Sequence, residues 1–512
     1  MTRTDYSLKN LKYAIFGQFI GLIISFLSRM IFVRTLSAEY LGINGLFTNI
    51  LSILSLAELG IGVSIVYSMY KPLAENDIYK IKALISLYKK AYTIIGITIA
   101  VVGLAIIPFL DYLIKDMPNI PNIKFIYSMF VINSSISYFF SYKRSLIIAD
   151  QKRYIATIYR YGFYFILNLF QIIILVITRN YFFYIGLQII NTLAENICIS
   201  KKADKLYPYL RDREKGILNK EDKKTIFKNI RAMMFHKVGS IVVTGTDNLL
   251  ISKLIGIKEV GLYSNYVLII NALNTIYTLI FESFTASIGN LGVTETNEKN
   301  KFIFDCINLF GFWIYGFSSI CLINLFNHFI YLWLGKEYLF PVSFVLIIVI
   351  NFYLSGMRKS VLTFRDALGL FAHDRYKAII EAIINLIISI LLSKYFGISG
   401  ILIGTIISTL TTCFWVEPFV LYKYGFHASI KNYFYKYIYY TIIMIISGII
   451  TWNICKIFSS NSILKFIYKV LVCITVPNIL FLLIFWRTEE FQYILKILLN
   501  KYRLLKKTKK LI

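Results

Sequence analysis

The stretch Thr93-Ile-Ile-Gly-Ile-Thr-Ile-Ala-Val-Val-Gly-Leu-Ala-Ile-Ile-Pro-Phe-Leu110 holds 18 consecutive residues without a charged side chain. A helix needs about 20 mostly apolar residues to cross the hydrocarbon core of a bilayer. Comparable apolar runs recur along the chain, among them Gln171–Thr178, Phe344–Asn351 and Ala382–Leu392. The pattern predicts a chain that crosses a membrane many times.

The composition agrees with this prediction, because 57% of the 512 residues are hydrophobic, against about 45–50% in soluble domains. We therefore predict an all-α integral membrane protein with about 14 transmembrane helices. The predicted segments lie near 11–34, 41–70, 91–113, 123–142, 155–178, 181–199, 235–253, 260–290, 303–327, 339–357, 375–394, 398–422, 433–455 and 464–486.

The chain is strongly basic, with 55 Lys and Arg against 27 Asp and Glu. If Met1 is cytoplasmic, most of these basic residues fall in the even-numbered loops and at the two ends, which is the pattern that specifies the inner side of a membrane. The charge thus indicates orientation rather than a nucleic-acid partner. It predicts a multi-pass membrane protein with both termini cytoplasmic. The basic loop Lys201–Lys228 and the tail from Lys501 are expected to lie against anionic membrane lipids.

Three pairs of short segments resemble each other at an offset of about 220 residues, which suggests two related repeats of six spans. The pairs are Arg34–Leu46 with Lys253–Asn265, Gln151–Tyr154 with His373–Tyr376, and Ile189–Leu193 with Ile406–Leu410. They predict two pseudo-symmetric lobes around a central cavity. The expected divisions are an N-lobe at 1–200, a basic cytoplasmic linker at 201–234, a C-lobe at 235–430, and two further helices with a basic tail at 431–512.

Polar residues follow one face of four predicted spans at helical spacing. In lipid such a face must contact protein or a water-filled cavity. The alternative interpretation for the isolated hydroxyls is hydrogen bonding between helices. The residues are Gln18, Ser25, Ser28 and Arg29 in the first span, Asn44, Thr48, Ser52, Ser55 and Glu58 in the second, His236, Ser240, Thr244, Asp247 and Asn248 in the seventh, and Asn271, Asn274, Thr275, Thr278 and Glu282 in the eighth.

Enzyme motifs are absent from the sequence. There is no phosphate loop, zinc-protease motif, dinucleotide fingerprint or nucleophile elbow. The six cysteines are scattered singly, which is typical of neither a disulfide framework nor a metal site. We expect no catalytic residues, no cofactor and no metal.

Several stretches resemble bacterial Wzx-type flippases, which move polysaccharide repeat units across the membrane. The resemblance covers most of the chain to about residue 430 and rests on Phe32–Phe47, Leu56–Gly62, Tyr70–Ala74, Ile199–Pro208, Gly400–Ser408 and Glu417–Phe426. These flippases belong to the multidrug/oligosaccharidyl-lipid/polysaccharide exporter superfamily, whose members have twelve or fourteen spans in two lobes that open alternately to either side.

The resemblance implies a substrate of oligosaccharide linked to undecaprenyl diphosphate, used for capsule, exopolysaccharide or O-antigen of lipopolysaccharide. A polysaccharide polymerase and glycosyltransferases of the same pathway are implied partners. In relatives the first, second, seventh and eighth spans line the cavity, which are the four spans with polar faces. The candidate substrate-binding residues are Arg29, Gln18, Ser25, Asn44, Thr48, Ser52, Glu58, Ser240, Thr244, Asn248, Asn271, Asn274 and Thr278, and those for ion coupling are Asp247 and Glu282.

Arg29 is the most specific candidate, because it lies deep in the first span and its guanidinium matches phosphate oxygens. A salt bridge to Glu58 is the alternative role for this side chain. Two other functions stay open: a cation-coupled multidrug exporter of the same superfamily, and a polytopic glycan polymerase or ligase. Arg29 argues for an anionic cargo, and the short external connections argue against an enzyme with a large outer loop.

Overall fold

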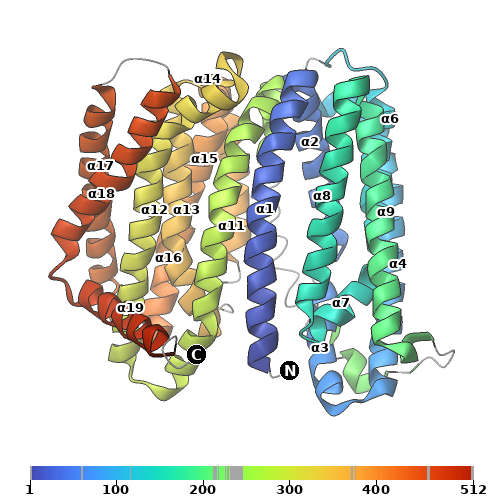
Figure 1. Cartoon of the computed structure of the whole chain (residues 1–512), viewed down its shortest axis with the longest axis horizontal. Coiled ribbons are helices and arrows are strands. Elements are labelled where there is room, and N and C mark those ends of the chain that lie inside the picture. Colours follow the sequence, from blue (N-terminus) through green and yellow to red (C-terminus); the bar gives the residue numbers. More distant parts are fainter. Residues whose placement is uncertain are drawn as a thin grey trace. The chain divides into compact units, whose positions relative to one another are not determined.

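The computed structural model describes residues 3–508 except 59–60, 116, 212–215, 217, 225, 228–229, 231–245, 371–372, 375 and 458–461. Within these residues the chain is helical and contains no strand (Figure 1). In the described part of the chain, twelve helices are long and apolar enough to cross a membrane, and a thirteenth span results if the bent pair α6 (Ile123–Phe139) and α7 (Ser141–Ala149) is one span. The prediction of an all-α, multi-pass membrane protein is confirmed. The predicted span 235–253 lies largely outside the described residues.

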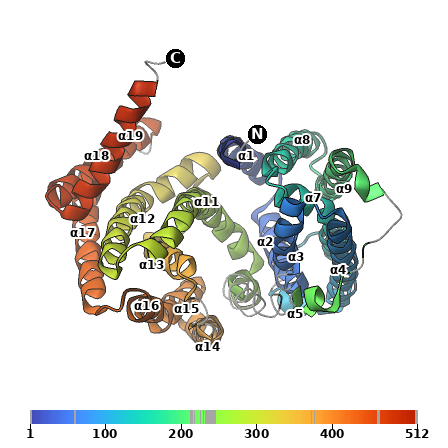
Figure 2. The ribbon, with the colours of Figure 1, turned by 90° about the horizontal axis from the view of Figure 1, so that it is seen from below.

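The chain divides into two compact units, Met1–Ser264 and Asn265–Ile512. Besides α6 and α7, the first unit contains α1 (Arg3–Thr35), α2 (Ala38–Leu54), η1 (Ser55–Glu58), α3 (Ile61–Glu75), α4 (Ile78–Ala105), η2 (Ile107–Phe109), α5 (Leu110–Leu113), α8 (Arg153–Thr178), α9 (Tyr181–Leu206) and η3 (Pro208–Arg211). Within this unit, α1 lies beside α8, and α8 beside α9 (Figures 1 and 2).

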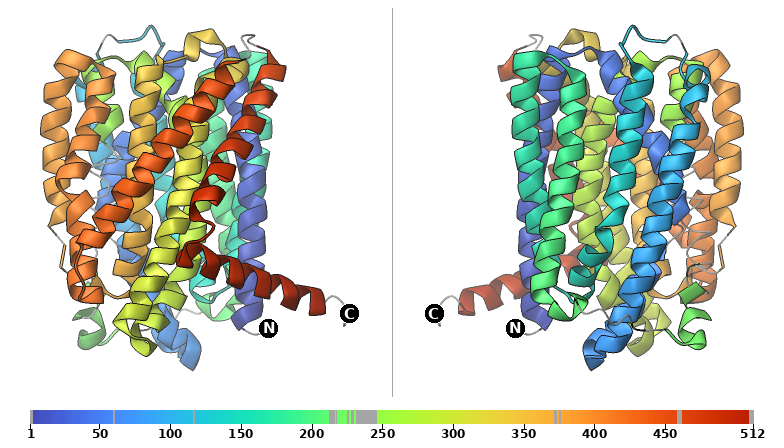
Figure 3. Two further views of the ribbon diagram at one scale, coloured as in Figure 1. Left: turned by 90° about the vertical axis from the view of Figure 1, so that its left-hand side faces the viewer. Right: turned by 90° about the vertical axis from the view of Figure 1, so that its right-hand side faces the viewer.

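The long helix α11 (Ile257–Thr294) begins in the first unit and continues into the second. The second unit then contains α12 (Asn297–Leu334), η4 (Lys336–Tyr338), α13 (Val342–Ala367), α14 (Lys377–Phe396), α15 (Ile398–Thr411), α16 (Cys413–Val420), the π-helical turn η6 (Leu421–Phe426), α17 (Lys431–Lys456), α18 (Ile463–Phe485) and α19 (Glu489–Thr508). The final helix α19 turns sharply away from the direction of α18 (Figure 3).

Equivalent helix pairs pack in the two units. In the first unit α4 packs against α6, α6 against α9, and α8 against α9. In the second unit α12 packs against α13, α13 against α15, and α14 against α15. When the predicted spans are numbered within each repeat, the same pairs occur in both. The third span packs against the fourth, the fourth against the sixth, and the fifth against the sixth. The packing supports an internal duplication, while the exact lobe boundaries stay a prediction.

The second predicted span, 41–70, is not one continuous helix. It is divided into α2, η1 and α3. Gly62, just after the break, lies so close to α4 that a Cβ atom there would stand 2.2 Å from the hydroxyl oxygen of Tyr92. A glycine is required for that approach, and glycine also weakens a continuous helix.

The described part of the basic linker packs against the first unit. Leu218 and Ile226 are buried in the same apolar cluster as Leu84. The carboxylate of Asp222 pairs with the Lys80 ammonium at 2.8 Å. These contacts of Leu218, Asp222 and Ile226 hold the described part of the linker against α4.

Candidate functional site

A cavity of about 230 Å³ lies among four helices of the first unit: α1, α2, α8 and α9. Three of the predicted site residues, Ser25, Arg29 and Asn44, line it. The remaining lining residues are Ser28, Phe32, Leu41, Tyr164, Leu167, Asn168, Gln171, Tyr184 and Gln188. The cavity joins polar side chains of the first span to polar side chains of the fifth and sixth spans.

The α1 side of the cavity follows from helical geometry. Ser25, Ser28, Arg29 and Phe32 are spaced at i, i+3, i+4 and i+7, which places them on one face of the helix. Close packing against α8 holds this face in position, since a Cβ atom on Gly17 would stand 2.2 Å from a ring carbon of Tyr161.

Arg29 is the one charged residue among the cavity's lining residues. Its Nη1 donates to the Ser264 hydroxyl at 3.0 Å. The Tyr164, Tyr181 and Tyr184 side chains surround it closely enough to interact electrostatically. Guanidinium has five N–H donors, and Ser264 accepts the only recorded Arg29 hydrogen bond in the described part of the chain. Within the described residues, the other guanidinium N–H groups are thus left for a ligand.

The alternative salt bridge between Arg29 and Glu58 is not present among the described residues. Instead, Glu58 accepts a hydrogen bond from the Tyr92 hydroxyl at 2.5 Å. Glu58 lies in η1, the short turn after α2, and does not line the cavity. Its carboxylate thus holds the broken second span against α4.

The structure places the other first- and second-span candidates away from the cavity lining. Gln18 accepts a hydrogen bond from the Tyr161 hydroxyl at 2.7 Å, which ties α1 to α8. Thr48 and Ser52 are exposed, and the Ser52 hydroxyl donates to the Thr48 carbonyl at 2.9 Å. These residues stay candidates for substrate contact, but they do not contribute to this cavity.

The seventh-span candidates Ser240 and Thr244 lie outside the described residues. Asp247 and Asn248 belong to the described part of the first unit, where Asp247 has a buried Oδ1 without a recorded hydrogen-bond partner. The eighth-span candidates lie on α11 in the second unit; Asn271 and Glu282 are exposed, and Asn274 and Thr278 are half-buried. Glu282 lies close enough to Lys359 of α13 for electrostatic interaction.

Five polar cavity residues of α8 and α9 are missing from the predicted set: Tyr164, Asn168, Gln171, Tyr184 and Gln188. Their spacing of three or four residues within each helix is the signal that could have identified them. The predicted site included polar faces of the first, second, seventh and eighth spans, and none of the fifth or sixth.

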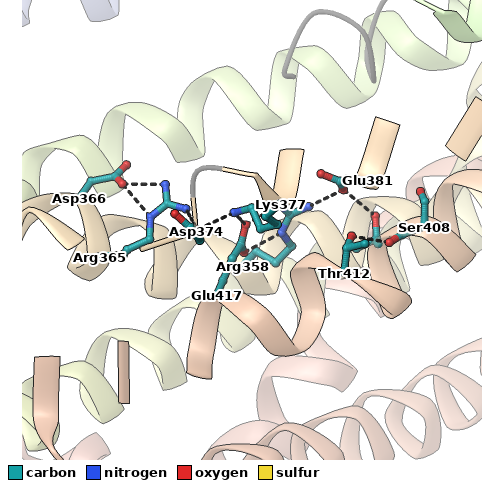
Figure 4. A network of polar contacts seen from close by, with 10 residues as sticks. Arg358, Arg365, Asp366, Asp374, Lys377, Glu381, Ser408, Thr412 and Glu417 are labelled. Carbon is teal, nitrogen blue, oxygen red and sulfur yellow. Dashed lines mark hydrogen bonds and ion pairs between the residues drawn. The ribbon is translucent and has the colours of Figure 1, made fainter. Parts of the chain in front are cut away.

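The second unit contains a buried ion network that the sequence analysis also missed (Figure 4). Arg358 of α13 donates to both carboxylate oxygens of Glu417 of α16, at 2.9 and 2.7 Å. Lys377 at the start of α14 bonds the same carboxylate. The network continues through Asp374, Arg365 and Asp366, and Glu381 lies 3.6 Å from Arg358. It joins three helices of the unit.

Among the described residues, no group of three or more His, Cys, Asp or Glu side chains is placed to hold a metal ion.

The sequence of this chain matches the model of a known protein family. The family model described as "Polysaccharide biosynthesis protein" matches residues 7–284, more than half of the chain. The chain belongs to this family. The match includes α1 to α9, and hence every lining residue of the cavity. No curated protein sequence matches the chain.

Solved structures show the same fold at low sequence identity. The lipid II flippase MurJ in an inward closed conformation matches with a TM-score of 0.64 and 14% identity, over 93% of this chain and 99% of that one. An inward-facing multidrug resistance MATE family transporter of the MOP superfamily matches with a TM-score of 0.56 and 17% identity, over 76% and 91%. The Vibrio cholerae MATE transporter VcmN matches with a TM-score of 0.53 and 13% identity, over 82% and 97%.

These findings confirm the resemblance predicted from the sequence motifs at the level of family and fold. The chain therefore shares its fold with these solved structures.

Proposed function

We propose that this protein is a flippase that moves oligosaccharide repeat units, linked to undecaprenyl diphosphate, from the inner to the outer leaflet of a bacterial plasma membrane. The product would supply capsule, exopolysaccharide or O-antigen synthesis. The observation that carries the proposal is Arg29, a guanidinium deep in a membrane span that lines a polar cavity and, among the described residues, has a hydrogen bond only to Ser264.

The lipid carrier of such a substrate bears a negatively charged diphosphate. Its charge must pass a region without bulk water, where an unpaired ion is very costly. Arginine stays charged at any accessible pH, and its forked donors match phosphate oxygens. When the guanidinium and the diphosphate meet, each lowers the cost of burying the other. Membership in a polysaccharide biosynthesis family and similarity in fold to a lipid II flippase support this type of substrate.

A cation-coupled multidrug exporter is the second candidate, favoured by the fold similarity to MATE transporters and by the buried carboxylate of Asp247. Arg29 makes it the weaker candidate, because a cationic drug would be repelled from the cavity. A glycan polymerase or ligase is less well supported, because the solved structures with this fold are a flippase and multidrug transporters.

The proposal is tested in cells that lack the chain. Lipid-linked repeat units should accumulate unpolymerised on the inner face of the membrane, where an enzyme added to intact spheroplasts cannot reach them. Repeat units that are exposed outside but unpolymerised would instead indicate a polymerase.

We also propose that both termini are cytoplasmic, because the tail beyond Trp486 and the loop from Lys201 share the basic character of inner loops. A phosphatase that needs the external compartment should be inactive when fused after Ile512. The same fusion in a connection between α17 and α18 should be active. Activity of the fusion after Ile512 would overturn this topology.

Asp247 and Glu282 are proposed to take part in ion or proton coupling, since carboxylates on polar faces of membrane helices seldom persist without a role. Asp247→Asn should lower transport several-fold and weaken its response to uncouplers, and Glu282→Gln should have a smaller effect because this side chain is exposed. The exposed Glu298, in the first turn of α12, offers a matched control, Glu298→Gln, that should leave transport unchanged. If both test variants transport and respond to uncouplers like the parent, the coupling role is wrong.

A further inference from the structure

The cavity contains more hydrogen-bonding groups than Arg29 requires. Gln171 donates from its amide nitrogen to the Tyr184 carbonyl at 3.0 Å, and Asn168 donates to the Tyr164 carbonyl at 2.8 Å. In the described part of the chain, no hydrogen bond to the side-chain oxygen of either amide is recorded. The α8 and α9 backbones thus orient two buried amides beside the cavity and leave their oxygens as acceptors.

Gln188 strengthens this observation. It lines the cavity from α9, and its side-chain amide has no recorded hydrogen bond among the described residues. The same holds for the hydroxyls of Ser25 and Ser28 on α1. Unsatisfied polar groups are costly within a membrane, so this set of donors and acceptors is suited to a polar occupant that satisfies them.

We propose that this cavity is the subsite for the sugar ring attached directly to the diphosphate, and that this ring is uncharged. The inference rests on the proposed function, because it places the ring beside a diphosphate held by Arg29. It adds to that function a chemical class for the first sugar and a set of residues that recognise it.

The size of the cavity limits its occupant. Its volume of about 230 Å³ leaves room for several water-sized groups. That space can hold a single sugar ring.

The charge of the cavity selects among sugars. Its recorded lining holds one cation, Arg29, and otherwise neutral amides, hydroxyls and apolar side chains. Because the diphosphate would pair with Arg29, an acidic sugar would lack a cation of its own there, and a cationic sugar would lack an anion. Neutral amides and hydroxyls, by contrast, match the donors and acceptors of a neutral ring. Tyr164 and Tyr184 add flat apolar faces against which such a ring can pack.

The test measures binding of three purified lipids to the full chain in detergent. The probes are undecaprenyl diphosphate alone, the same carrier with one neutral N-acetylhexosamine, and the same carrier with one hexuronic acid. The neutral sugar should tighten binding about tenfold relative to the bare carrier, equivalent to about 1.4 kcal/mol. The hexuronic acid should give no gain. An equal gain for both sugars, or no gain for the neutral one, would overturn the proposal.

Variants locate the subsite. Gln188→Ala should reduce the ratio of the two affinities, neutral sugar to bare carrier, from about ten to near one. Asn191→Ala changes an amide on the same helix that does not line the cavity, and it should keep the parental ratio. Ser25→Leu, which fills the cavity from α1 and leaves the three amide residues unchanged, should also remove the gain. This second variant keeps the test decisive if loss of an amide disturbs folding.

The outcomes separate this inference from the proposed function. Failure of the parent to bind any of the three carriers would reject the proposed function itself. Binding of the bare carrier that depends on Arg29, with a sugar gain that Gln188→Ala and Ser25→Leu leave intact, would reject only the sugar subsite.

Discussion

Arg29→Ala is expected to lower the rate of lipid-linked oligosaccharide transport at least about 100-fold while the protein still inserts at normal levels. Hydrogen bonds to charged groups contribute about 1.5–3 kcal/mol each, and a difference of about 1.4 kcal/mol corresponds to a factor of ten. Loss of a forked pair of donors to the diphosphate thus accounts for an effect of this size. The measurement is transport of a fluorescent lipid-linked substrate in vesicles that contain the purified chain.

Conservative variants separate binding from structural support. Arg29→Lys should retain part of the activity, because an ammonium keeps the charge but loses the fork. Glu58→Gln should be milder than Arg29→Ala, since Glu58 bonds to Tyr92 and does not line the cavity. Arg34→Ala removes an exposed arginine from the last turn of the same helix and serves as the matched control. Parental transport by well-expressed Arg29→Ala protein would refute the role of this residue.

The sequence predicted cavity residues best where polar side chains recur along one face of a single helix. Arg29 and Ser25 share a face of α1 by spacing alone, and the structure places both at the cavity. Gln171 and Gln188 show the same kind of spacing with their neighbours, yet each belongs to a span whose other faces are apolar. Their spacing could have identified a polar face on α8 and on α9, but it does not indicate that these faces turn toward α1. Such a contact is decided by tertiary packing.

The break of the second span shows a different limit. An apolar segment from 41 to 70 is long enough for a tilted continuous helix, but the structure divides it before Gly62. Close approach to Tyr92 of α4 decides this geometry. Hydropathy measures whether a segment can lie in lipid, and it contains no information about which neighbour bends the segment.

The ion network of the second unit was not predictable for a related reason. Arg358 and Glu417 are separated by 59 residues and lie on different helices. The first unit contains a similar pair: Arg144 of α7 bonds Glu195 of α9 at 2.5 Å. Each pair joins the fourth span of its repeat to the sixth. The two ion pairs thus support the internal duplication independently of the similar sequence segments.

The two pairs differ in burial, which leads to a prediction about stability. The Glu417 side chain is 0% exposed and that of Arg358 is 20% exposed, whereas Glu195 and Arg144 are 15% and 27% exposed. Removing one partner of a buried ion pair costs about 3–5 kcal/mol, because the remaining charge stays buried without compensation. Arg358→Met should therefore lower the melting temperature of the purified protein strongly, although Lys377 still contacts Glu417.

The corresponding variant of the first unit, Arg144→Met, should destabilise the protein less, because water can solvate the remaining Glu195 carboxylate. A double variant, Arg358→Met with Glu417→Met, should melt above the single variant Arg358→Met, since replacing both partners leaves no isolated charge between them. Lys377 keeps a carboxylate in that double variant, because Asp374 lies 3.0 Å away. Melting curves of the four proteins, the parent included, follow the intrinsic fluorescence in one detergent. The prediction is wrong if the single variant Arg358→Met melts at the temperature of the parent, or if the double variant melts below the single variant. Glu417 would then not depend on Arg358 for its burial, and the network would contribute little to holding α13 and α16 together.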